Sequence, residues 1–393
     1  MFERDLTPTL KECVATFPVT VLTGPRQSGK TTLLRYQYPD YHYITLEAPD
    51  ILTAIQADPR SFLQADDASG IILDEIQRLP DLLSYIQTMV DEAQTPGQFI
   101  ISGSQNFLLS SHVSQTLAGR SAILELLPLS YAEYRSNTQF DDLDLWTWLY
   151  NGGYPRPYQQ NLSRPIWQRS YIQTYLERDV RDLINIKDII KFRQFLSLCA
   201  GRHGQLLNMN ELGNDAGVSH TTVKEWLSLL EASYIVFRLP PYYRNFNKRI
   251  VKTPKLYFYD TGLLCQLLGI ESPKHLKQHA MRGAIFEGFI ITEVMKAYYN
   301  QGRHAPIYFW RDHSNHEIDL LIDQAGELSA IEIKSGQTFQ PDMLKGLKNW
   351  QRLAPNSHSL LVTGGNQQPF QQHSFQIHPW HVSASTLCGY NSY

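Results

Sequence analysis

The feature of this 393-residue chain that most constrains its fold is the run GPRQSGKT at Gly24–Thr31. It fits the pattern G-x-x-x-x-G-K-[ST], in which backbone N–H groups surround phosphates, the lysine reaches the outer phosphates and the hydroxyl joins Mg²⁺. The apolar stretch Val19–Leu22 predicts a strand before this run, and Thr32–Arg35 predicts a helix whose N-terminal dipole faces the anion. The sequence therefore predicts a nucleoside triphosphate site whose binding residues are Gly24, Pro25, Arg26, Gln27, Ser28, Gly29, Lys30, Thr31 and Thr32.

A second run, IILDE at Ile71–Glu75, has three apolar residues followed by two carboxylates. This pattern is typical of a buried parallel strand that delivers charge at its carboxyl end. We expect Asp74 to hold Mg²⁺ together with Thr31, and Glu75 to polarise the attacking water, because phosphoryl transfer needs a positioned nucleophile and charge compensation. Alone, the run also fits a strand that leads into the acidic cap of a helix. Beside the phosphate-binding run, we interpret it as catalytic, with ATP and Mg²⁺ as ligands and with Lys30 and Glu75 as catalytic residues.

The composition excludes several other classes of protein. The net charge of −3 gives no global attraction to nucleic acid or to an anionic membrane, so any binding patch must be local. The four cysteines show no C-x-x-C spacing, which argues against a zinc site and against a secreted disulfide scaffold. No apolar run approaches the ~18 residues that a membrane span needs. We therefore expect a soluble cytoplasmic protein with no membrane partner.

Short apolar strands alternate with helical stretches from Phe17 to about Ser130. This alternation predicts an α/β fold with a parallel sheet covered by helices on both faces. The expected strands are Val19–Thr23, His42–Leu46, Ile71–Leu73, Gln98–Ser102 and Ala122–Leu126.

Polar residues near the ends of two of these strands are candidates for contact with the γ-phosphate. Ser104 and Gln105 follow the fourth expected strand, where they fit either a phosphate sensor or a plain turn into a helix. Arg120 lies just before the fifth strand, and its guanidinium fork matches the charge that develops on phosphate. Arg120 is therefore a candidate arginine finger, acting in cis or from a neighbouring subunit, and a surface salt bridge is the alternative.

The order of these elements, with an arginine before the fifth strand, resembles the AAA+ ATPases. More specifically, the runs GPRQSGKTTLLR, IILDEIQRLPDLL, ISGSQNF and LAGRSAILELLPLSYAEY are similar to the prokaryotic AAA_14 family, whose members carry a C-terminal domain of unknown function called DUF4143. The resemblance covers nearly the whole chain. It implies a nucleotide-bound ring or other homo-oligomer with ATP at subunit interfaces, and it supplies no physiological substrate.

The middle of the chain begins with a turn-rich break, NGGYPRP at Asn151–Pro157, which predicts a hinge between domains. A helical pattern follows over Ile166–Ala200. Within this pattern, Arg178, Asp179 and Arg181 match a recurrent stretch of the same family. A solvated helix face with i,i+3 pairs is the interpretation we favour for them.

Asn208–Tyr243 has the pattern of a helix-turn-helix with a wing. Asn210 is the expected cap of a first helix that ends at Ala216–Gly217, and Ser219 is the expected cap of a second helix that runs to Ala232. The second helix is the one that can enter a major groove in this geometry.

A basic stretch, 238–255, follows the two helices. Between positions 232 and 259, six lysines or arginines occur without a carboxylate, and aromatic residues lie among them. Cations for phosphates beside aromatic faces for bases are typical of nucleic-acid binding, so we expect DNA as a partner. Winged helices also dock proteins, so a protein partner is the alternative. The cations are Arg238, Arg244, Lys248, Arg249, Lys252 and Lys255, and the aromatic residues are Tyr242, Tyr243 and Phe246.

The last third holds a second group of candidate catalytic residues. Glu287 lies on the apolar helical stretch Ala284–Ala297, and strands are expected at 306–310, 317–322 and 330–334. Period-2 alternation puts Glu332 and Lys334 on one face of the last strand. Asp319 on one strand, a Glu-x-Lys on the next and a carboxylate on a helix resemble the PD-(D/E)xK restriction-endonuclease-like fold.

This resemblance implies that Asp319 and Glu332 share Mg²⁺, that Glu287 completes or orients the metal shell, and that Lys334 positions or stabilises the attacking hydroxide. A short Glu-x-Lys is common by chance, so two alternatives stay open: an amphipathic hairpin with a surface ion pair, and a retained fold that no longer cleaves. The nearby His313 is expected to be a surface histidine rather than a metal ligand, as is His316.

We expect four parts in the chain: an AAA+ ATPase domain at 1–150, a helical linker at 151–204, a winged-helix domain at 205–270 and a restriction-endonuclease-like α/β domain at 271–393. In the last part, one helix is expected over Pro341–Leu353 and a closing strand over His358–Thr363, and the tail from Gln367 carries no recognisable chemistry. Three functions compete: an ATPase that repositions a DNA-binding, nuclease-like half, a nucleotide-gated protein that recruits a partner without cutting it, and a nuclease for which ATP is only a switch.

Overall fold

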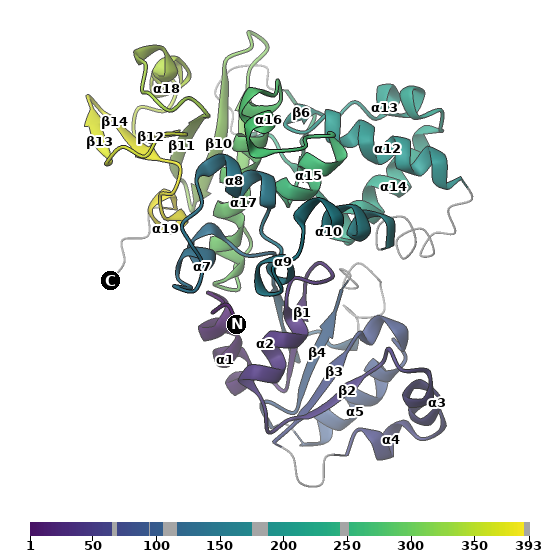
Figure 1. Ribbon diagram of the computed structural model, residues 1–393. Coiled ribbons are helices and arrows are strands. Elements are labelled where there is room, and N and C mark those ends of the chain that lie inside the picture. Colours follow the sequence, from purple (N-terminus) through teal and green to yellow (C-terminus); the bar gives the residue numbers. More distant parts are fainter. Residues whose placement is uncertain (65–68, 94, 105–115, 175–187, 244–250, 389–393) are drawn as a thin grey trace.

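The computed structural model describes residues 1–64, 69–93, 95–104, 116–174, 188–243 and 251–388. Figure 1 shows an N-terminal sheet with its helices at one end of the molecule, and a helical middle part and a second sheet at the other end. The middle part touches the second sheet, because the Tyr242 N–H donates to the Phe309 carbonyl at 2.8 Å. The chain is therefore built from an N-terminal α/β part, a helical middle part and a C-terminal α/β part.

The N-terminal sheet is parallel, as the sequence predicts. Its strand order is β2-β3-β4-β1-β5, and each neighbouring pair runs parallel. Successive residues of a strand point to opposite faces, so Val21 packs in one hydrophobic core and Leu22 in another. The strands are β1 (Val19–Thr23), β2 (His42–Thr45), β3 (Ile71–Asp74), β4 (Phe99–Gly103) and β5 (Ser121–Glu125). The helices are α1 (Thr7–Thr16), α2 (Lys30–Gln37), α3 (Pro49–Ala57), α4 (Pro59–Phe62), the 3₁₀ turn η1 (Ile76–Arg78) and α5 (Leu82–Ala93).

The expected hinge at Asn151–Pro157 is wrong, because this segment is a buried turn held from both sides. The Gly153 N–H donates to Asp260 Oδ2 at 2.7 Å, and the Gly153 carbonyl accepts from Leu129 N–H at 2.8 Å. Gly152 has a φ of +71°, and a Cβ there would lie 2.5 Å from Asp260 Oδ1. The glycines thus serve a close approach of two segments rather than flexibility.

Short helices surround this turn and form the start of the middle part. Within the described part of the helical pattern predicted over Ile166–Ala200, α10 and α12 are helices, and the candidates Arg178, Asp179 and Arg181 lie outside the described residues. The helices are α7 (Tyr131–Arg135), α8 (Leu145–Asn151), α9 (Pro155–Gln159), α10 (Arg164–Tyr171) and α12 (Ile189–Gly201).

Two capped helices and a small antiparallel sheet complete the middle part. The first helix, α13 (Met209–Ala216), is capped by Asn208, whose side chain accepts from the Glu211 N–H at 3.2 Å. The prediction of Asn210 as the cap was wrong, since that residue lies inside the first turn. Helix α14 (His220–Ala232) is capped by Ser219 as predicted. The sheet order is β6-β8-β7, with β6 (Gln205–Leu206), β7 (Val236–Leu239) and β8 (Lys255–Phe258).

The C-terminal part is a mixed sheet with helices on its two faces. Its order is β13-β14-β12-β11-β10-β9; β10 is antiparallel to β9 and β11, whereas β12 is parallel to β11 and β14. Leu320 and Ile331 pack in the core that contains α17, whereas Leu321 and Ala330 pack with Trp350 of α18. The strands are β9 (Ile307–Arg311), β10 (Glu317–Gln324), β11 (Glu327–Lys334), β12 (His358–Thr363), β13 (Phe370–Gln372) and β14 (Phe375–Pro379). Helices α15 (Thr261–Leu267) and α16 (Pro273–Gln278) contact α8 of the middle part. The helices of the C-terminal part are α17 (Arg282–Tyr299), η4 (Pro341–Leu344), α18 (Lys345–Gln351) and α19 (Ala384–Leu387).

One detail of this part differs from the sequence prediction. The single helix expected over Pro341–Leu353 is a 3₁₀ turn followed by a short α-helix, η4 and α18. The segment after Gln367, for which no element was predicted, contributes β13, β14 and α19. The strand predicted at His358–Thr363 is confirmed.

Candidate functional site

The predicted phosphate-binding run forms a tight loop between β1 and α2. Gly24 has a φ of +145°, and a Cβ at this position would lie 2.2 Å from the Leu126 carbonyl oxygen, so only glycine fits. Gly29 has a φ of +101° and starts α2. Lys30 Nζ turns back into the loop, where it donates to the carbonyls of Gly24 and Pro25 at 2.8 and 2.9 Å. The loop therefore holds its lysine beside a helix N-terminus, where an anion is favoured.

Lys30 is almost fully buried, with 4% of its surface exposed. Burial lowers the pKa of Lys30 to about 8, although the nearby carboxylates of Glu75 and Asp74 work in the opposite direction. A buried ammonium that hydrogen-bonds only to carbonyl groups in the described part of the chain is well suited to a phosphate oxygen, because the added negative charge would restore its ordinary basicity.

Asp74, at the carboxyl end of β3, is surrounded by hydroxyl groups. Thr31 Oγ1 and Tyr43 OH each donate to Asp74 Oδ2 at 2.7 Å, and Ser102 Oγ donates to Asp74 Oδ1. Hydroxyl donors orient the carboxylate without cancelling its charge. A carboxylate beside the Thr31 hydroxyl is the oxygen-donor pair that Mg²⁺ prefers, so these residues fit the expected magnesium.

Sequence reasoning missed Tyr43 and Ser102 as partners of Asp74. The sheet register explains how they meet, because Asp74 pairs with Thr45 on β2 and with Ser102 on β4. The carboxyl ends of parallel strands lie at one edge of the sheet, so the polar residue at the end of β4 was a usable signal. Tyr43 gave no such signal, since its hydroxyl reaches the site from within β2.

Glu75 follows Asp74 and has an unusual backbone conformation. Its φ is +60°, in the left-handed region that non-glycine residues rarely adopt, and such strain is often found at functional sites. Its Oε2 accepts from Ser104 Oγ at 3.0 Å and from Gln77 Nε2. The carboxylate is therefore held beyond the end of β3, next to Ser104, the candidate sensor residue. Gln105 lies outside the described residues.

Arg4 holds the outside of the phosphate-binding loop, which sequence reasoning missed. Its guanidinium donates to the Ser28 carbonyl at 2.9 Å, to the Leu127 carbonyl at 2.7 Å and to Glu133 Oε1 at 2.9 Å. Arg4 is 8% exposed and Glu133 1% exposed, so this is a buried ion pair. No local motif could reveal it, because its partners lie far away in the sequence.

Helix α10 of the middle part also contacts the loop. Trp167 Nε1 donates to Gln27 Oε1 at 3.2 Å, and Tyr171 OH donates to the Arg26 carbonyl at 3.1 Å. Arg26 pairs with Glu47 at 3.0 Å on the surface. The loop is thus in contact with a helix outside its own domain.

Arg120 lies at the other end of the sheet from the loop. Its carbonyl accepts from the N–H of Val19, the first residue of β1, whereas the phosphate-binding loop follows the last residue of that strand. Its guanidinium forms two hydrogen bonds with Asp91, at 2.5 and 2.9 Å. This placement contradicts a role in cis. A role at the nucleotide of a neighbouring subunit stays a prediction.

The four predicted residues of the C-terminal site lie close together. Lys334 Nζ is 3.2 Å from Asp319 Oδ2 and 2.6 Å from Glu332 Oε1. The Ile333 N–H also donates to Asp319 Oδ2 at 2.8 Å, which orients that carboxylate across the β10–β11 pair. Burial, followed by the charge of Asp319, raises the pKa of Glu332 to about 8. Its Oε2 atom is buried and has no hydrogen-bond partner among the described residues.

Glu287 reaches the same site from α17, where it meets a lysine that was assigned a different role. Lys255 Nζ lies 3.0 Å from Glu287 Oε1 and 2.5 Å from Glu317 Oε1, and Tyr257 OH also donates to Glu287. Burial raises the pKa of Glu287, whereas Lys255 lowers it. The prediction that Lys255 serves a nucleic-acid patch was wrong, because its side chain is 4% exposed and its ammonium pairs with two carboxylates.

Other members of the predicted basic stretch are also engaged or lie outside the description. Arg238 pairs with Glu231 through two hydrogen bonds of 2.6 and 2.7 Å. Tyr242 is buried and donates to Asp323 at 2.8 Å, whereas Tyr243 is exposed. Lys252 is exposed. Arg244, Phe246, Lys248 and Arg249 lie outside the described residues.

In the parts of the chain that the structure describes, no group of three or more His, Cys, Asp or Glu side chains is arranged to hold a metal ion. Lys334 lies between Asp319 and Glu332, and Lys255 lies beside Glu287, so an ammonium group is present at each of the carboxylates that were predicted to act on a metal. His316 is partly exposed and lies 3.0 Å from Asp312, and His313 is exposed, so the expectation of surface histidines is confirmed.

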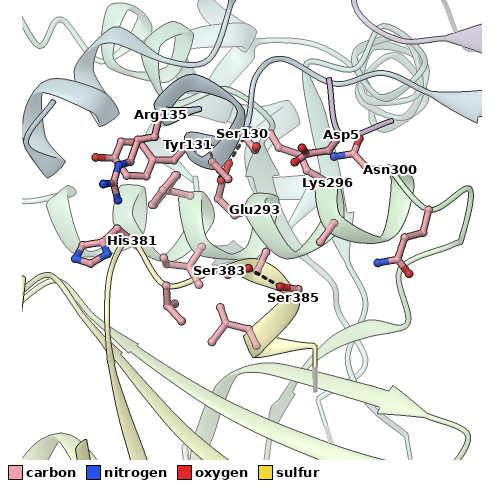
Figure 2. Close-up of a pocket in the computed structure, with 18 of the residues that line it drawn as sticks. Asp5, Ser130, Tyr131, Arg135, Glu293, Lys296, Asn300, His381, Ser383 and Ser385 are labelled. Carbon is pink, nitrogen blue, oxygen red and sulfur yellow. Dashed lines mark hydrogen bonds and ion pairs between the residues drawn. The ribbon is translucent and has the colours of Figure 1, made fainter. Parts of the chain in front are cut away.

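A cavity of about 500 Å³ lies where the N-terminal part meets α17 and the C-terminal segment. Figure 2 shows Glu293 and Lys296 projecting from α17 toward Ser130 and Asp5. The Tyr131 N–H donates to Glu293 Oε2, and Lys296 Nζ donates to the Leu129 carbonyl, both at 2.8 Å. Helix α17 thus carries Glu287 and also holds Leu129 and Tyr131, where the N-terminal part leads into the middle part. Across the described ranges, no helix has the length and apolarity needed to cross a bilayer.

Comparison with known proteins gives three family matches along the chain. Residues 16–135 match a family described as an AAA domain. Residues 142–274 match a domain of unknown function, DUF8612, and residues 282–382 match the domain of unknown function DUF4143.

Two relatives match most of this chain. An uncharacterized protein of Mycobacterium tuberculosis is 34% identical over 350 residues, which cover 88% of this chain and 76% of the relative. An uncharacterized protein of Haemophilus influenzae is 22% identical over 380 residues, covering 88% of this chain and 89% of the relative. Among solved structures, a Walker-type ATPase of Pyrococcus abyssi is 14% identical with a TM-score of 0.48, covering 68% of this chain and 96% of that chain. RuvB of Thermotoga maritima is 18% identical with a TM-score of 0.31, covering 60% and 87%.

Proposed function

This chain belongs to the AAA_14/DUF4143 family of AAA-type ATPases, and from that premise we propose that it binds ATP with Mg²⁺ and hydrolyses it at the β1–α2 loop. The observation that carries the proposal is the group of residues at the carboxyl edge of the N-terminal sheet. Lys30 supplies a buried cation, and Thr31 and Asp74 supply oxygen ligands. The carboxylate of Glu75 lies just past the end of β3, where it accepts a hydrogen bond from Ser104. Mg²⁺, when bound, neutralises charge on the phosphates.

Each residue then has a separate role. Lys30 leaves the loop carbonyls to meet the outer phosphate oxygens, and the loop N–H groups bind the remaining ones. Asp74 would hold the metal with Thr31, because its hydroxyl partners leave its charge uncompensated. Glu75 orients and polarises the attacking water, while Ser104 fixes the position of the Glu75 carboxylate.

The test is Glu75→Gln, which keeps the shape of the side chain and removes the base. ATP affinity should stay within about twofold, whereas phosphate release should fall by ~10²–10⁴, the usual contribution of a general base. Calorimetry with ATP and a phosphate-release assay measure the two quantities. Glu47→Gln is the matched control, because this exposed carboxylate also lies near the loop but pairs only with Arg26 among the contacts described. Unchanged turnover in Glu75→Gln would remove Glu75 from this role.

A second function is proposed for the other half of the chain: a winged-helix region that contacts DNA and a PD-(D/E)xK-like domain that cleaves it with a metal ion. The convergence of three largely buried carboxylates, Glu287, Asp319 and Glu332, with the partly exposed Lys334 supports this proposal. Exposure at the start of α14, at His220, Thr221 and Lys224, supports the contact with DNA. The proposed division of the chain is 1–150, 151–204, 205–270 and 271–393.

Two variants test this second function. Asp319→Ala and Lys334→Ala should each abolish Mg²⁺- or Mn²⁺-dependent nicking of plasmid or single strands. Lys248→Glu combined with Arg249→Glu should weaken DNA retention and flatten its salt dependence, because fewer counterions are released on binding. Equal retention by the double variant would discard the basic patch.

The alternative is a nucleotide-gated binding or scaffold protein whose C-terminal half recruits protein or nucleic acid without cutting it. The pairing of the predicted metal ligands with lysines favours this alternative. If the wild-type protein leaves DNA and RNA intact under every nucleotide and metal condition, the alternative replaces the nuclease proposal.

Coupling between the two halves has a physical route in either case. Arg4 joins the Ser28 carbonyl of the loop to Glu133 of α7, and the N–H of Tyr131 in the same helix binds Glu293 of α17. A shift of the loop on nucleotide binding would therefore act on the helix that carries Glu287. We propose that the family's homo-oligomer places Arg120 at the nucleotide of the next subunit.

A further inference from the structure

Lys255 is a buried ammonium that belongs to the C-terminal carboxylate group although it comes from the middle part of the chain. It lies on β8, the central strand of the small sheet β6-β8-β7, and its side chain is 4% exposed. Burying an ammonium is costly unless it is paired. Lys255 is paired twice, with Glu287 Oε1 at 3.0 Å and with Glu317 Oε1 at 2.5 Å, and it also lies 5.4 Å from the centre of the Phe309 ring.

A second side chain of β8 supports this placement. Residues two apart on a strand share a face, so Tyr257 points the same way as Lys255. Tyr257 OH donates to Oε1 of Glu287, the same atom that meets Lys255 Nζ. Glu287 is thus held from the β8 side by an ammonium and a phenol hydroxyl.

The two lysines of the site divide its carboxylates into two pairs. Lys255 bridges Glu287 and Glu317, and Lys334 bridges Asp319 and Glu332. The side chain of Lys334 is 38% exposed, so it can swing into solvent when another cation arrives. Lys255 has no such exit, because it is enclosed by β8, α17 and the start of β10.

We propose that Lys255 is a positioning residue that acts as a resident counter-ion between Glu287 and Glu317, so that this site accepts at most one divalent ion, on the Asp319–Glu332 side. The inference rests on the proposed function only in treating these carboxylates as a cation-binding site. It changes the role of Glu287, which orients the site from the Lys255 side instead of serving as a metal ligand. It also means that both parts of the chain contribute side chains to the site: Lys255 comes from the middle part, and the carboxylates come from the C-terminal part.

The test counts Mn²⁺ ions bound by nucleotide-free, full-length protein, with electron paramagnetic resonance of the free ion. Lys255→Met removes the resident charge and leaves two adjacent carboxylates, so it should bind one more Mn²⁺ than wild type. Lys255→Arg restores the charge and should match wild type. Lys277→Met, an exposed lysine on α16, is the control and should also match. Adding Glu317→Gln to Lys255→Met should abolish the extra ion.

An unchanged count in Lys255→Met, in protein whose circular dichroism matches wild type, overturns the proposal. If that variant fails to fold, Glu287→Gln decides the matter. Its count should equal that of wild type, because Glu287 is not a ligand, and the loss of one ion would overturn the proposal. Cleavage of nucleic acid is measured separately. If Lys255→Met binds an extra ion but neither it nor the wild type cleaves DNA or RNA, the counter-ion proposal is supported and the nuclease function is rejected.

Discussion

The two polar sites of this protein use the same residue types in opposite ways. In the N-terminal site, the lysine donates to backbone carbonyls and the carboxylate of Asp74 accepts from hydroxyl groups. In the C-terminal site, Lys255 and Lys334 donate to carboxylates. The first arrangement leaves both charges available to a ligand, whereas the second cancels them internally.

The difference shows that residue type and strand-end position do not decide whether a site is ready for a charged ligand. The decisive factor is the partner of each charge. A hydroxyl orients a carboxylate and leaves it anionic, so a cation gains the full attraction. An ammonium occupies that same space, so an incoming metal must first displace it. We therefore expect the N-terminal site to bind Mg²⁺ with nucleotide readily and the C-terminal site to bind a metal only at a cost.

The largest expected effect is on the free energy of unfolding. It comes from Arg4 and Glu133, a buried ion pair beside the N-terminal loop in which the charges do cancel each other. Arg4→Met leaves Glu133 buried without its cation and frees the Ser28 carbonyl. Removing one partner of a buried pair typically costs ~3–5 kcal/mol of unfolding free energy. Urea denaturation measures this loss. Adding Glu133→Gln should recover part of it, and a loss no greater in Arg4→Met than in an exposed-arginine control such as Arg35→Met would contradict the structural role.

Replacing the lysine of each site in turn, and measuring ATP turnover, sharpens the comparison. Lys30→Met removes the cation that faces the phosphates, and phosphate release should fall by ~10²–10³, as when one electrostatic donor is lost from an active site. Lys334→Met should leave ATP turnover at the wild-type rate, because its charge is used within the C-terminal site. Lys11→Met, an exposed lysine on α1, is the control. Equal losses in Lys30→Met and Lys334→Met would show that the sites are not independent.

Acid should destabilise the contact between β8 and α17, the two elements that carry Lys255 and Glu287 of the C-terminal site. His203 Nδ1 accepts from the Phe258 N–H and Nε2 donates to the Ala284 carbonyl, so its neutral form joins β8 to α17. Burial lowers the pKa of His203 to about 3. The unfolded chain therefore takes up a proton below pH ~6.5 while the folded chain does not, and stability falls by ~1.4 kcal/mol per pH unit, or about 2 kcal/mol at pH 5.

Other buried acids of the chain titrate as well, so the measurement compares wild type with His203→Gln. Both proteins are unfolded with urea at pH 7 and pH 5. The variant should lose about 2 kcal/mol less between these values, since glutamine keeps a donor and an acceptor without titrating. Hydrogen exchange at pH 5 should locate the loosening in β8 and α17. The same pH dependence in both proteins would count against this assignment.

The smallest effect tests the hydroxyl partners themselves. Tyr43→Phe deletes one donor to Asp74, and Thr31 and Ser102 remain. Loss of one such hydrogen bond is worth ~1 kcal/mol, so Mg²⁺-dependent turnover should change by no more than about tenfold. A Mg²⁺ titration of phosphate release measures it. A loss as large as that of Lys30→Met would show that Tyr43 does more than orient the carboxylate.

Much of the fold was predictable because its signals are local. The strand limits of β1 and β12 were predicted to the residue, and the caps and ends of α14 follow from Ser219 and its neighbours. The hinge prediction failed because two adjacent glycines, Gly152 and Gly153, indicate flexibility when only the local sequence is considered. In the fold, the distant residue Asp260 packs against both glycines and holds the turn in place. Asn208 and Asn210 both have side chains that can cap a helix, and only the backbone shows that Asn208 is the residue at the N-terminus of α13.

The sequence by itself determined the phosphate-binding loop, the Asp74–Glu75 pair and the parallel sheet that brings them to one edge, since these depend on spacing and on alternation within short segments. Only the tertiary structure decided which charges are cancelled: that Arg4 supports the loop, that hydroxyls surround Asp74, and that Lys255 turns inward to Glu287. The reason is physical, because the energy of a buried charge depends on partners brought within hydrogen-bond distance by packing, and no local pattern records them.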